Sequence, residues 1–226
     1  ATDININLAL ASEEKGWAIA LGSTRALLES DAHKESFLIR KYAKSVPLIA
    51  NLGAVQLNYG YGADEVKRII EKTEADGLVL HLNGLQEVVQ DGGDLNFENL
   101  LPKIEAICKN VPFPVGVKEV GFGIHGEEAK KLADVGIAFI DVAGAGGTSW
   151  SQVEKLRTED ALRRNAAEAF NDWGLPPKDC ITSVRAKLPT IPLVSSGGMK
   201  TGADAAKAIA LGADVVGFAR SLLQAA

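Results

Sequence analysis

Residues 77–90, GLVLHLNGLQEVVQ, begin as an apolar run and then place His81, Asn83, Gln86 and Glu87 close together. If the apolar run continues as a strand to Asn83, its period of two puts His81 and Asn83 on one face and the neighbouring leucines on the other. Polar groups then collect at the carboxyl end of a buried strand, which is where parallel barrels and open sheets carry ligands and catalytic groups. The alternative for these residues alone is a satisfied core histidine followed by a capped loop.

The composition is that of an ordinary globular protein. Of 226 residues, 46% are hydrophobic and 23% are charged, which bounds the chain to one large domain or two small ones. The net charge of -5 gives no general attraction to nucleic acid or to anionic membranes. Cys108 and Cys180 lie far apart without metal-binding spacing, and no stretch resembles a signal or a membrane span. We therefore expect a cytoplasmic protein with reduced thiols and without a nucleic-acid or membrane partner.

Outward from residues 77–90, strand and helix patterns alternate, which indicates a parallel sheet with right-handed crossovers. The predicted strands are residues 17–21, 46–50, 78–83, 114–117, 136–142, 192–195 and 213–218. The predicted helices between and beside them are residues 3–15, 64–74 (with Asp64 as its cap), 97–109, 126–133, 179–187 and 203–210.

Seven strands are one short of a closed TIM (β/α)8 barrel. The chain opens on a helix and stops where a final helix should begin. We therefore expect residues 1–226 to form a single barrel domain whose first strand and last helix are missing from this sequence. Residues 151–175 are charged and helical in pattern, with arginines such as Arg163 expected to be exposed, so they predict a helical insertion or lid.

Two further strand ends carry candidate ligand-binding side chains. Asn51 ends the strand at 46–50, where its amide can bind a heterocycle or shape a turn. Lys118 shares a strand face with Gly116, so it is expected to point into the mouth of the barrel as a ligand or catalytic group. The alternative for Lys118 is a salt bridge to Glu119 or to a neighbouring residue.

Glycine-rich loops follow the later strands. Residues 141–150, DVAGAGGTSW, let the backbone approach a planar or anionic ligand closely, and Thr148 adds a hydroxyl. The loop lacks Gly-x-Gly-x-x-Gly followed by an acidic ribose ligand, so a doubly wound dinucleotide fold is not supported. The ends of the last two strands, at Gly198 and Ala219, predict the phosphate cup of the last quarter of such barrels.

Taken together, six segments resemble those of type 2 isopentenyl diphosphate isomerases. In chain order they are GSTR (22–25), ANLG (50–53), HLNGLQE (81–87), VKEVG (117–121), DVAGAGGTSW (141–150) and SGG (196–198). The resemblance implies a flavin mononucleotide (FMN) enzyme on a (β/α)8 barrel. Such an enzyme interconverts isopentenyl and dimethylallyl diphosphate on reduced FMN with Mg2+. NADPH as the reductant of FMN and a homo-oligomer, tetrameric or octameric, are expected with it.

The same resemblance implies roles for individual residues. Contacts to the flavin are implied for Ser23, Asn51, Lys118 and Thr148, and contacts to its phosphate for Gly198, Met199, Lys200, Ala219 and Arg220. Contacts to the substrate diphosphate are implied for Ser23, Thr24 and Arg25, with Gln86 beside the substrate and Glu87 on Mg2+. His81 and Asn83 are expected to line the same pocket as catalytic residues with Gln86.

The sequence also departs from that family. A Met-Thr-Gly-Gly motif for the flavin and an earlier Arg-Lys pair for the diphosphate are absent, and Gly84 stands where the family usually has proline. The nearest rival is another FMN barrel of the 2-hydroxy acid oxidase type, which needs a late catalytic histidine with a neighbouring arginine. All three histidines here, His33, His81 and His125, precede the predicted phosphate cup. A non-catalytic barrel serving as a binding module is the alternative of a different class.

Overall fold

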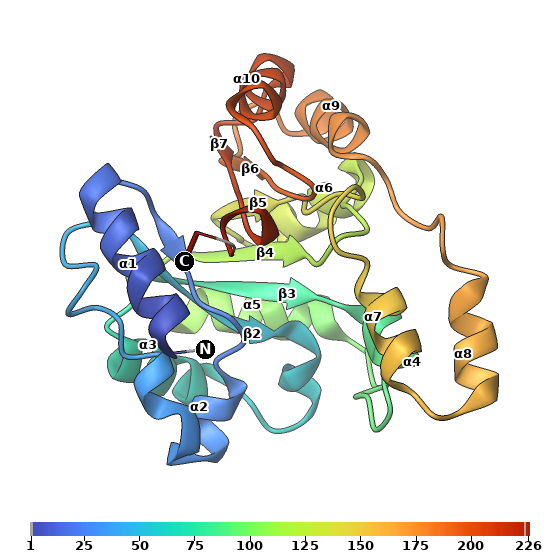
Figure 1. Ribbon diagram of the computed structural model, residues 1–226, viewed down its shortest axis with the longest axis horizontal. Coiled ribbons are helices and arrows are strands. Elements are labelled where there is room, and N and C mark those ends of the chain that lie inside the picture. Colours follow the sequence, from blue (N-terminus) through green and yellow to red (C-terminus); the bar gives the residue numbers. More distant parts are fainter. Residues whose placement is uncertain (1, 224) are drawn as a thin grey trace.

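A single curled sheet organises the computed structural model, which describes residues 2–223 and 225–226. Its seven strands follow one another in chain order, and each neighbouring pair is parallel. They are β1 (Ile19–Ala20), β2 (Leu48–Gly53), β3 (Gly77–Leu82), β4 (Val115–Glu119), β5 (Phe139–Asp141), β6 (Leu193–Ser195) and β7 (Val215–Val216). The predicted TIM-barrel-like class and strand order are confirmed (Figure 1).

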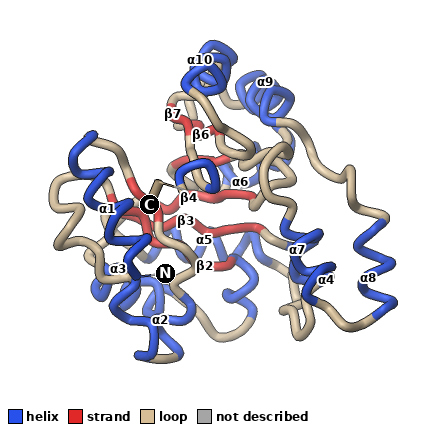
Figure 2. Tube along the Cα trace, in the orientation of Figure 1, coloured by secondary structure: helices blue, strands red, loops and turns tan. Residues whose placement is uncertain are grey.

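Helices flank the sheet or lie beyond the ends to which its central strands point, as Figure 2 shows. The α-helices are α1 (Thr2–Lys15), α2 (Arg25–Glu29), α3 (Ala63–Thr73), α4 (Gly84–Val89), α5 (Leu100–Asn110), α6 (Gly126–Asp134), α7 (Trp150–Arg157), α8 (Ala161–Glu168), α9 (Pro177–Lys187) and α10 (Gly202–Leu211). Short 3-10 turns are η1 (Asp31–Ser36), η2 (Ala54–Asn58) and η3 (Arg220–Leu222). Among the described residues, no helix combines the length and apolar character needed to cross a bilayer.

Alternation along the strands separates a core face from a ligand face. Leu78 and Leu80 of β3 are fully buried in a cluster that includes Ile69 of α3 and Ile104 of α5. His81, one residue further, points the opposite way because successive strand side chains alternate. The outer face of the sheet therefore makes the hydrophobic core with the helices, and the inner face is free to carry polar side chains.

Several element boundaries differ from the sequence prediction. The helix predicted from Asp64 begins at Ala63, and its N-cap residue is Gly62, whose N–H donates to the Glu65 side chain. The assignment of Asp64 as the cap was therefore wrong. The strand predicted for 213–218 is reduced to β7 because it lies at the edge of the sheet and pairs only with β6.

The predicted insertion contains α7 and α8, which pack against α4 at the end to which β3 and β4 point (Figure 1). Arg163 of α8 was expected to be exposed, but its side chain is 34% exposed and its Nη1 donates to Gln90 O at 2.6 Å. That bond satisfies a carbonyl just beyond the end of α4. The charged pattern of α8 therefore overestimated the exposure of Arg163, because it does not reveal that α8 packs against α4.

Two matching polar anchors hold the amino ends of strands at opposite parts of the sheet. Arg40 Nη2 pairs with Asp76 Oδ2 at 2.6 Å, and the same oxygen accepts the Leu48 N–H at the start of β2. Arg185 Nη2 pairs with Asp214 Oδ2 at 2.5 Å, and that oxygen accepts the Leu193 N–H at the start of β6. Each arginine also donates to nearby backbone carbonyls. Each anchor therefore connects an arginine outside the sheet, the first residue of one strand and the aspartate just before the next strand.

We expect Arg40→Ala to lower the free energy of unfolding by about 2–4 kcal/mol, because several carbonyls and the Asp76 carboxylate lose a charged donor. Urea unfolding followed by circular dichroism measures the change. Arg68→Ala, which removes an exposed arginine on α3, is the matched control and should change stability by less than about 0.5 kcal/mol. Equal effects of the two substitutions would contradict the anchor role of Arg40.

Candidate functional site

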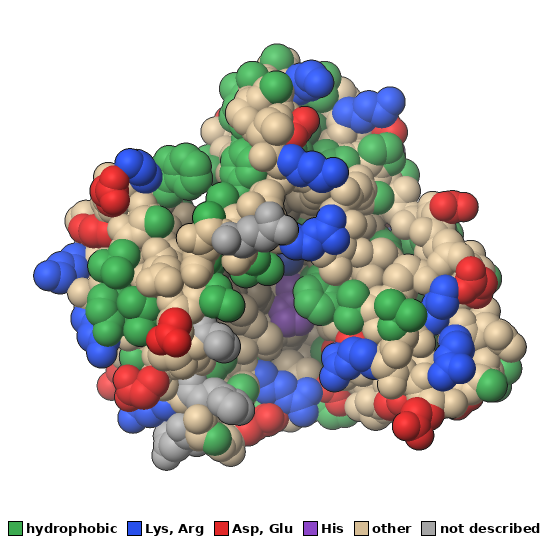
Figure 3. Space-filling view, in the orientation of Figure 1, with side chains coloured by type: hydrophobic (Ala, Val, Ile, Leu, Met, Phe, Trp, Pro, Cys, Tyr) green, Lys and Arg blue, Asp and Glu red, His purple; other side chains and the backbone are tan. Residues whose placement is uncertain are grey.

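One row of ionisable side chains crosses three neighbouring strands. The strand register aligns His81 of β3 with Lys118 of β4, and Lys118 with Asp141 of β5. Side chains paired in register lie on the same face, so the three groups are neighbours on the inner face near the carboxyl ends of the strands. Figure 3 shows a hollow in this view of the molecule, with a histidine at its floor and Lys or Arg side chains around it.

His81 is held in a fixed orientation. Its Nδ1 lies 2.8 Å from Asn51 Oδ1, while Asn51 Nδ2 donates to Leu21 O at 3.2 Å. Gly53 leaves the space that the ring occupies, since a Cβ there would lie 3.2 Å from His81 Nε2. Burial, assisted by the nearby Lys118 charge, lowers the pKa of His81 to about 4. The imidazole is therefore neutral at pH 7, donating from Nδ1 and presenting Nε2 as an acceptor.

Lys118 lies between that neutral imidazole and a buried carboxylate. Its Nζ donates to the backbone carbonyl of Glu119 at 2.6 Å, so the predicted alternative of a salt bridge to the Glu119 carboxylate is not what forms. Burial lowers the pKa of Lys118, and the charges of Asp141 and Glu119 oppose the shift. The Glu119 carboxylate instead accepts the N–H groups of residues 120–122 and shapes the loop after β4.

Asp141 is a site residue that sequence analysis quoted only as the start of a loop. Its carboxylate accepts the Ser196 hydroxyl at 2.8 Å and the Ala143 N–H at 3.1 Å. Burial raises the pKa of Asp141, while Lys118 and these hydrogen bonds act in the opposite direction. The usable signal was that Asp141 ends its strand on the inner face, as His81 and Lys118 do.

The two glycine-rich loops pack directly on each other. A Cβ at Gly197 would lie 2.0 Å from Gly144 O, and a Cβ at Gly147 would lie 2.8 Å from Gly198 N. Gly197 and Gly198 also have φ values of 98° and 76°, which favour glycine. Thr148 follows this contact, and its carbonyl would lie 2.9 Å from a Cβ at Gly121. The fold thus brings the loops after β4, β5 and β6 together.

The predicted phosphate-binding residues gather beside these loops. Ser221 Oγ donates to Met199 O at 3.1 Å, which brings the segment of Ala219 and Arg220 next to the segment of Gly198 to Lys200. The Lys200 N–H already donates to Asp204 Oδ2 at 3.1 Å, and Thr201 caps α10. The amide of Lys200 is therefore occupied by the cap, while Lys200 and Arg220 themselves are exposed.

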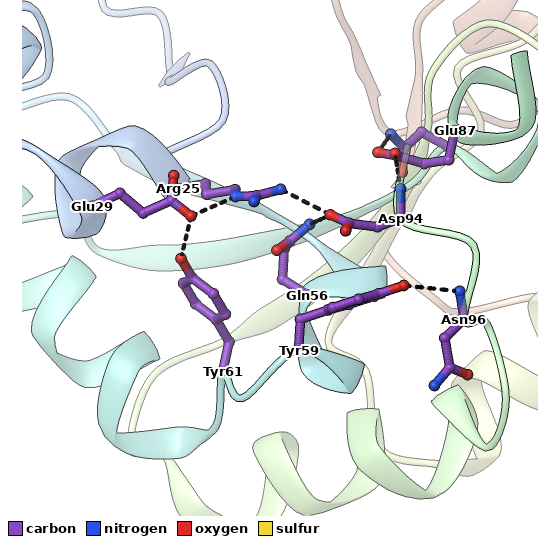
Figure 4. A network of polar contacts seen from close by, with 9 residues as sticks. Arg25, Glu29, Gln56, Tyr59, Tyr61, Glu87, Asp94 and Asn96 are labelled. Carbon is purple, nitrogen blue, oxygen red and sulfur yellow. Dashed lines mark hydrogen bonds and ion pairs between the residues drawn. The ribbon is translucent and has the colours of Figure 1, made fainter. Parts of the chain in front are cut away.

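A second group of predicted residues lies around α2 and α4. Ser23 is exposed, whereas Thr24 is fully buried and its hydroxyl donates to Asn51 O at 2.7 Å. Arg25 Nη1 pairs with Asp94 Oδ2 at 2.8 Å, and its Nε pairs with Glu29 Oε1 at 2.7 Å (Figure 4). Ser23 and part of the Arg25 side chain are therefore open to solvent, whereas Thr24 fastens the loop to β2.

Glu87 lies inside the first turn of α4. It is buried, its Oε1 accepts Asn83 Nδ2 at 2.7 Å, and its Oε2 accepts the Asp94 N–H at 2.8 Å. Asn83 lies beyond the end of β3 and is the N-cap residue of α4, so the predicted strand ends one residue early. His81 and Asn83 nevertheless line one cavity of about 170 Å³, with Phe97 and Leu100 among its walls.

Gln86 faces the predicted insertion. Its Nε2 donates to Glu154 Oε1 of α7 at 3.2 Å, and Glu154 is 3% exposed. Arg157 Nη1 lies 3.3 Å from the same oxygen. Sequence analysis missed Glu154 because its partner lies on a helix far away in the chain, and it missed Asp94 for the same reason.

Comparisons with known proteins identify the family. A family model described as FMN-dependent dehydrogenase matches residues 62–226. Proteins named isopentenyl-diphosphate delta-isomerase are 73% identical in Oceanobacillus iheyensis over 100% of this chain, and 53% identical in Nostoc sp. over 99% of it. The chain spans 65% and 64% of those two relatives' own lengths.

Solved structures support the fold alone. A mandelate oxidase mutant with an FMN adduct has a TM-score of 0.63 at 18% identity, covering 98% of this chain and 60% of that one. An inosine 5' monophosphate dehydrogenase from Legionella pneumophila has a TM-score of 0.58 at 20% identity, covering 93% and 52%. The chain therefore belongs to the FMN-dependent dehydrogenase family, and it is similar over its length to relatives named isopentenyl-diphosphate delta-isomerase, in line with its resemblance to the type 2 enzymes.

Proposed function

We propose that the protein is an FMN-dependent isomerase that interconverts isopentenyl and dimethylallyl diphosphate with Mg2+. The observation that carries the proposal is the 73% identity, over the whole chain, to a relative of that name. The geometry supports it, because the row of His81, Lys118 and Asp141 and the network of Arg25, Glu87 and Asp94 lie at the same end of one parallel sheet. NADPH as the reductant of FMN and a homo-oligomeric assembly belong to the same proposal.

The inner face fits a flavin through its shape and its donors. The contact between Gly144 and Gly197 leaves no room for side chains, so the backbone itself forms that part of the loops and lets a planar ligand approach closely. In the proposed complex, Asn51, Lys118 and Thr148 hold the flavin ring, and the loops at Gly198 and Ala219 hold its phosphate. Reduced FMN supplies an electron-rich surface and a ring nitrogen able to move a proton.

The edge at α4 fits a cation such as Mg2+. Asn83 Oδ1 is buried without a hydrogen-bond partner, and it belongs to the amide that donates to Glu87. The described residues contain no group of three or more His, Cys, Asp or Glu side chains that could hold a metal ion, and this edge offers one carboxylate, Glu87, and one amide oxygen, Asn83 Oδ1. That donor set suits Mg2+, which takes one or two carboxylates and completes its shell with water and substrate phosphates. Glu87 is the proposed protein ligand.

The remaining residues orient the substrate and keep water out. Moving the double bond requires a proton to be added at one carbon and removed at another, and the carbon chain must stay dry meanwhile. The Phe139 ring fills the space beside Gly116 on the inner face, where a Cβ would approach it to 2.3 Å, and adds an apolar surface there. Gln86, which has no titratable proton near pH 7, is proposed to position the substrate while Glu154 fixes its amide.

The direct test is anaerobic incubation of the protein with FMN, a reductant, Mg2+ and isopentenyl diphosphate, followed by product analysis. Formation of dimethylallyl diphosphate, dependent on both FMN and Mg2+, supports the proposal. A protein that binds FMN but oxidises a 2-hydroxy acid without isomerising the diphosphate would refute it. Absence of flavin absorbance after reconstitution would favour the non-catalytic module.

We expect Glu87→Gln to lower kcat/KM at fixed Mg2+ by at least about tenfold while FMN stays bound, because the lost charge serves the metal and not the cofactor. Turnover against Mg2+ concentration and flavin absorbance after gel filtration measure the two effects. Glu105→Gln removes an exposed carboxylate of α5 that pairs with Lys109 and is the matched control. An unchanged Mg2+ requirement in Glu87→Gln would remove Glu87 from the metal site.

We expect the neutral state of His81 to make the protein less stable in acid. An unfolded histidine titrates near pH 6.5, whereas burial lowers the pKa of His81 to about 4. Between these values only the unfolded chain takes up the proton, so stability falls as the pH decreases through this window, by up to about 1.4 kcal/mol per pH unit.

His81→Asn should remove that part of the pH dependence, since an amide does not titrate. Urea unfolding from pH 4 to pH 7 measures it. His125→Asn, at an exposed histidine, should leave the wild-type pH dependence in place. The assignment of a neutral His81 fails if His81→Asn and wild type lose stability in parallel as the pH falls.

A further inference from the structure

Asp94 connects parts of the site that are far apart in the sequence. It lies in the loop between α4 and α5, and its side chain is 18% exposed. Its Oδ2 accepts Arg25 Nη1 at 2.8 Å and Gln56 Nε2 at 2.8 Å (Figure 4). Gln56 is itself 3% exposed, so the carboxylate is fixed from the protein interior while the arginine approaches it from the outside.

The backbone of the same residue reaches the proposed metal ligand. The Asp94 N–H donates to Glu87 Oε2 at 2.8 Å, and Asn83 holds the other Glu87 oxygen. Asp94 therefore positions the Glu87 carboxylate through its backbone N–H and the Arg25 guanidinium through its side chain.

Arg25 is clamped on a second edge as well. Its Nε pairs with Glu29 Oε1 at 2.7 Å, and Tyr61 OH donates to that same oxygen at 3.0 Å (Figure 4). Among the described residues no hydrogen bond from Arg25 Nη2 is found, and the side chain is 44% exposed. The clamps therefore hold the guanidinium in one orientation and leave Nη2 for an outside anion.

We infer that Asp94 is a positioning residue that, through Arg25, sets the affinity for a metal-bound diphosphate. The inference rests on the proposed function and deepens it. Asp94 touches neither substrate nor metal in this role. It fixes the guanidinium at a set place relative to Glu87, so that a diphosphate bridging the two meets a prearranged pair of charges and loses less freedom on binding.

A positioning role and a purely electrostatic role of Asp94 predict opposite changes in diphosphate affinity when Asp94 is replaced, so the direction of the change tests the inference. Asp94 is an anion next to the proposed anion site, so removing its charge without any positioning role would tighten diphosphate binding. Loss of positioning would weaken binding. Asp94→Asn separates the two, because it removes the charge and keeps both the side-chain shape and the backbone N–H that Glu87 uses.

The experiment measures binding of inorganic pyrophosphate in the presence of Mg2+ by calorimetry. The proteins are wild type, Asp94→Asn, Arg25→Ala and the double variant, each loaded with FMN. We expect Asp94→Asn to raise Kd by roughly tenfold or more, the scale of a lost charge-assisted hydrogen bond. In the Arg25→Ala background the same substitution should no longer weaken binding, because Asp94 positions the anion site only through Arg25.

Asp94→Glu provides a second variant, since it keeps the charge and moves the carboxylate; it too should weaken binding. Asp134→Asn, at an exposed carboxylate on α6, is the matched control and should bind as wild type does. In turnover assays, Asp94→Asn should raise KM for isopentenyl diphosphate with little change in kcat, because the contact is to the non-reacting end of the substrate.

Tighter or unchanged pyrophosphate binding in Asp94→Asn would overturn the inference, and so would additive effects of Asp94→Asn and Arg25→Ala. Pyrophosphate binding that is insensitive to Arg25→Ala would overturn it as well. Failure of the proposed function looks different: the binding pattern would hold while isopentenyl diphosphate is not isomerised. If isopentenyl diphosphate is isomerised but the effects of Asp94→Asn and Arg25→Ala on pyrophosphate binding are additive, the proposed function stands and the positioning role of Asp94 is refuted.

Discussion

The parallel register of β3, β4 and β5 is the constraint on which the site depends. It aligns His81, Lys118 and Asp141 on the inner face, one from each strand. A slip of one residue in any of these strands would turn its polar side chain toward the hydrophobic core and a leucine or valine toward the ligand side. The fully buried Leu80 and Val117 resist such a slip, since each packs on the outer face next to its polar neighbour. The core therefore fixes the chemistry of the site through the alternation of the strands.

Once the row is fixed, the loops beyond the strands differ in how they contribute. The loops after β5 and β6 meet through glycines whose backbones approach too closely for side chains, so this part of the site is made of backbone atoms. The opposite part is made of side chains: Arg25 of α2, Glu87 of α4 and Asp94 of the loop after α4 form one network. A planar cofactor with a phosphate tail suits the first environment, and a metal-bound diphosphate suits the second.

Most features set by neighbouring residues in the chain were predicted correctly, and features set by distant contacts were not. The strands and helices with strong periodicity were found, because alternation and helical spacing are local properties. Edge elements were overestimated: β7 is short because only one neighbour supports it. The N-cap of α3 was predicted at Asp64, because aspartate is a more common capping residue than glycine. The helix instead begins after Gly62, whose N–H donates to the Glu65 side chain. Arg163 was misjudged because α8 packs against α4, which a sequence pattern does not show.

The sequence by itself determined that polar residues end the strands of a parallel sheet, and its motifs determined the family. It placed His81, Lys118, Glu87 and the glycine loops at the carboxyl ends of those strands, because the alternation of apolar and polar residues is written in the chain. Only the tertiary structure decided that Asp141 faces Lys118, that Glu154 holds Gln86, and that Asp94 joins Arg25 to Glu87. These contacts link residues up to 69 positions apart, and such pairings arise from the curvature of the sheet and the packing of its loops, which no local pattern encodes.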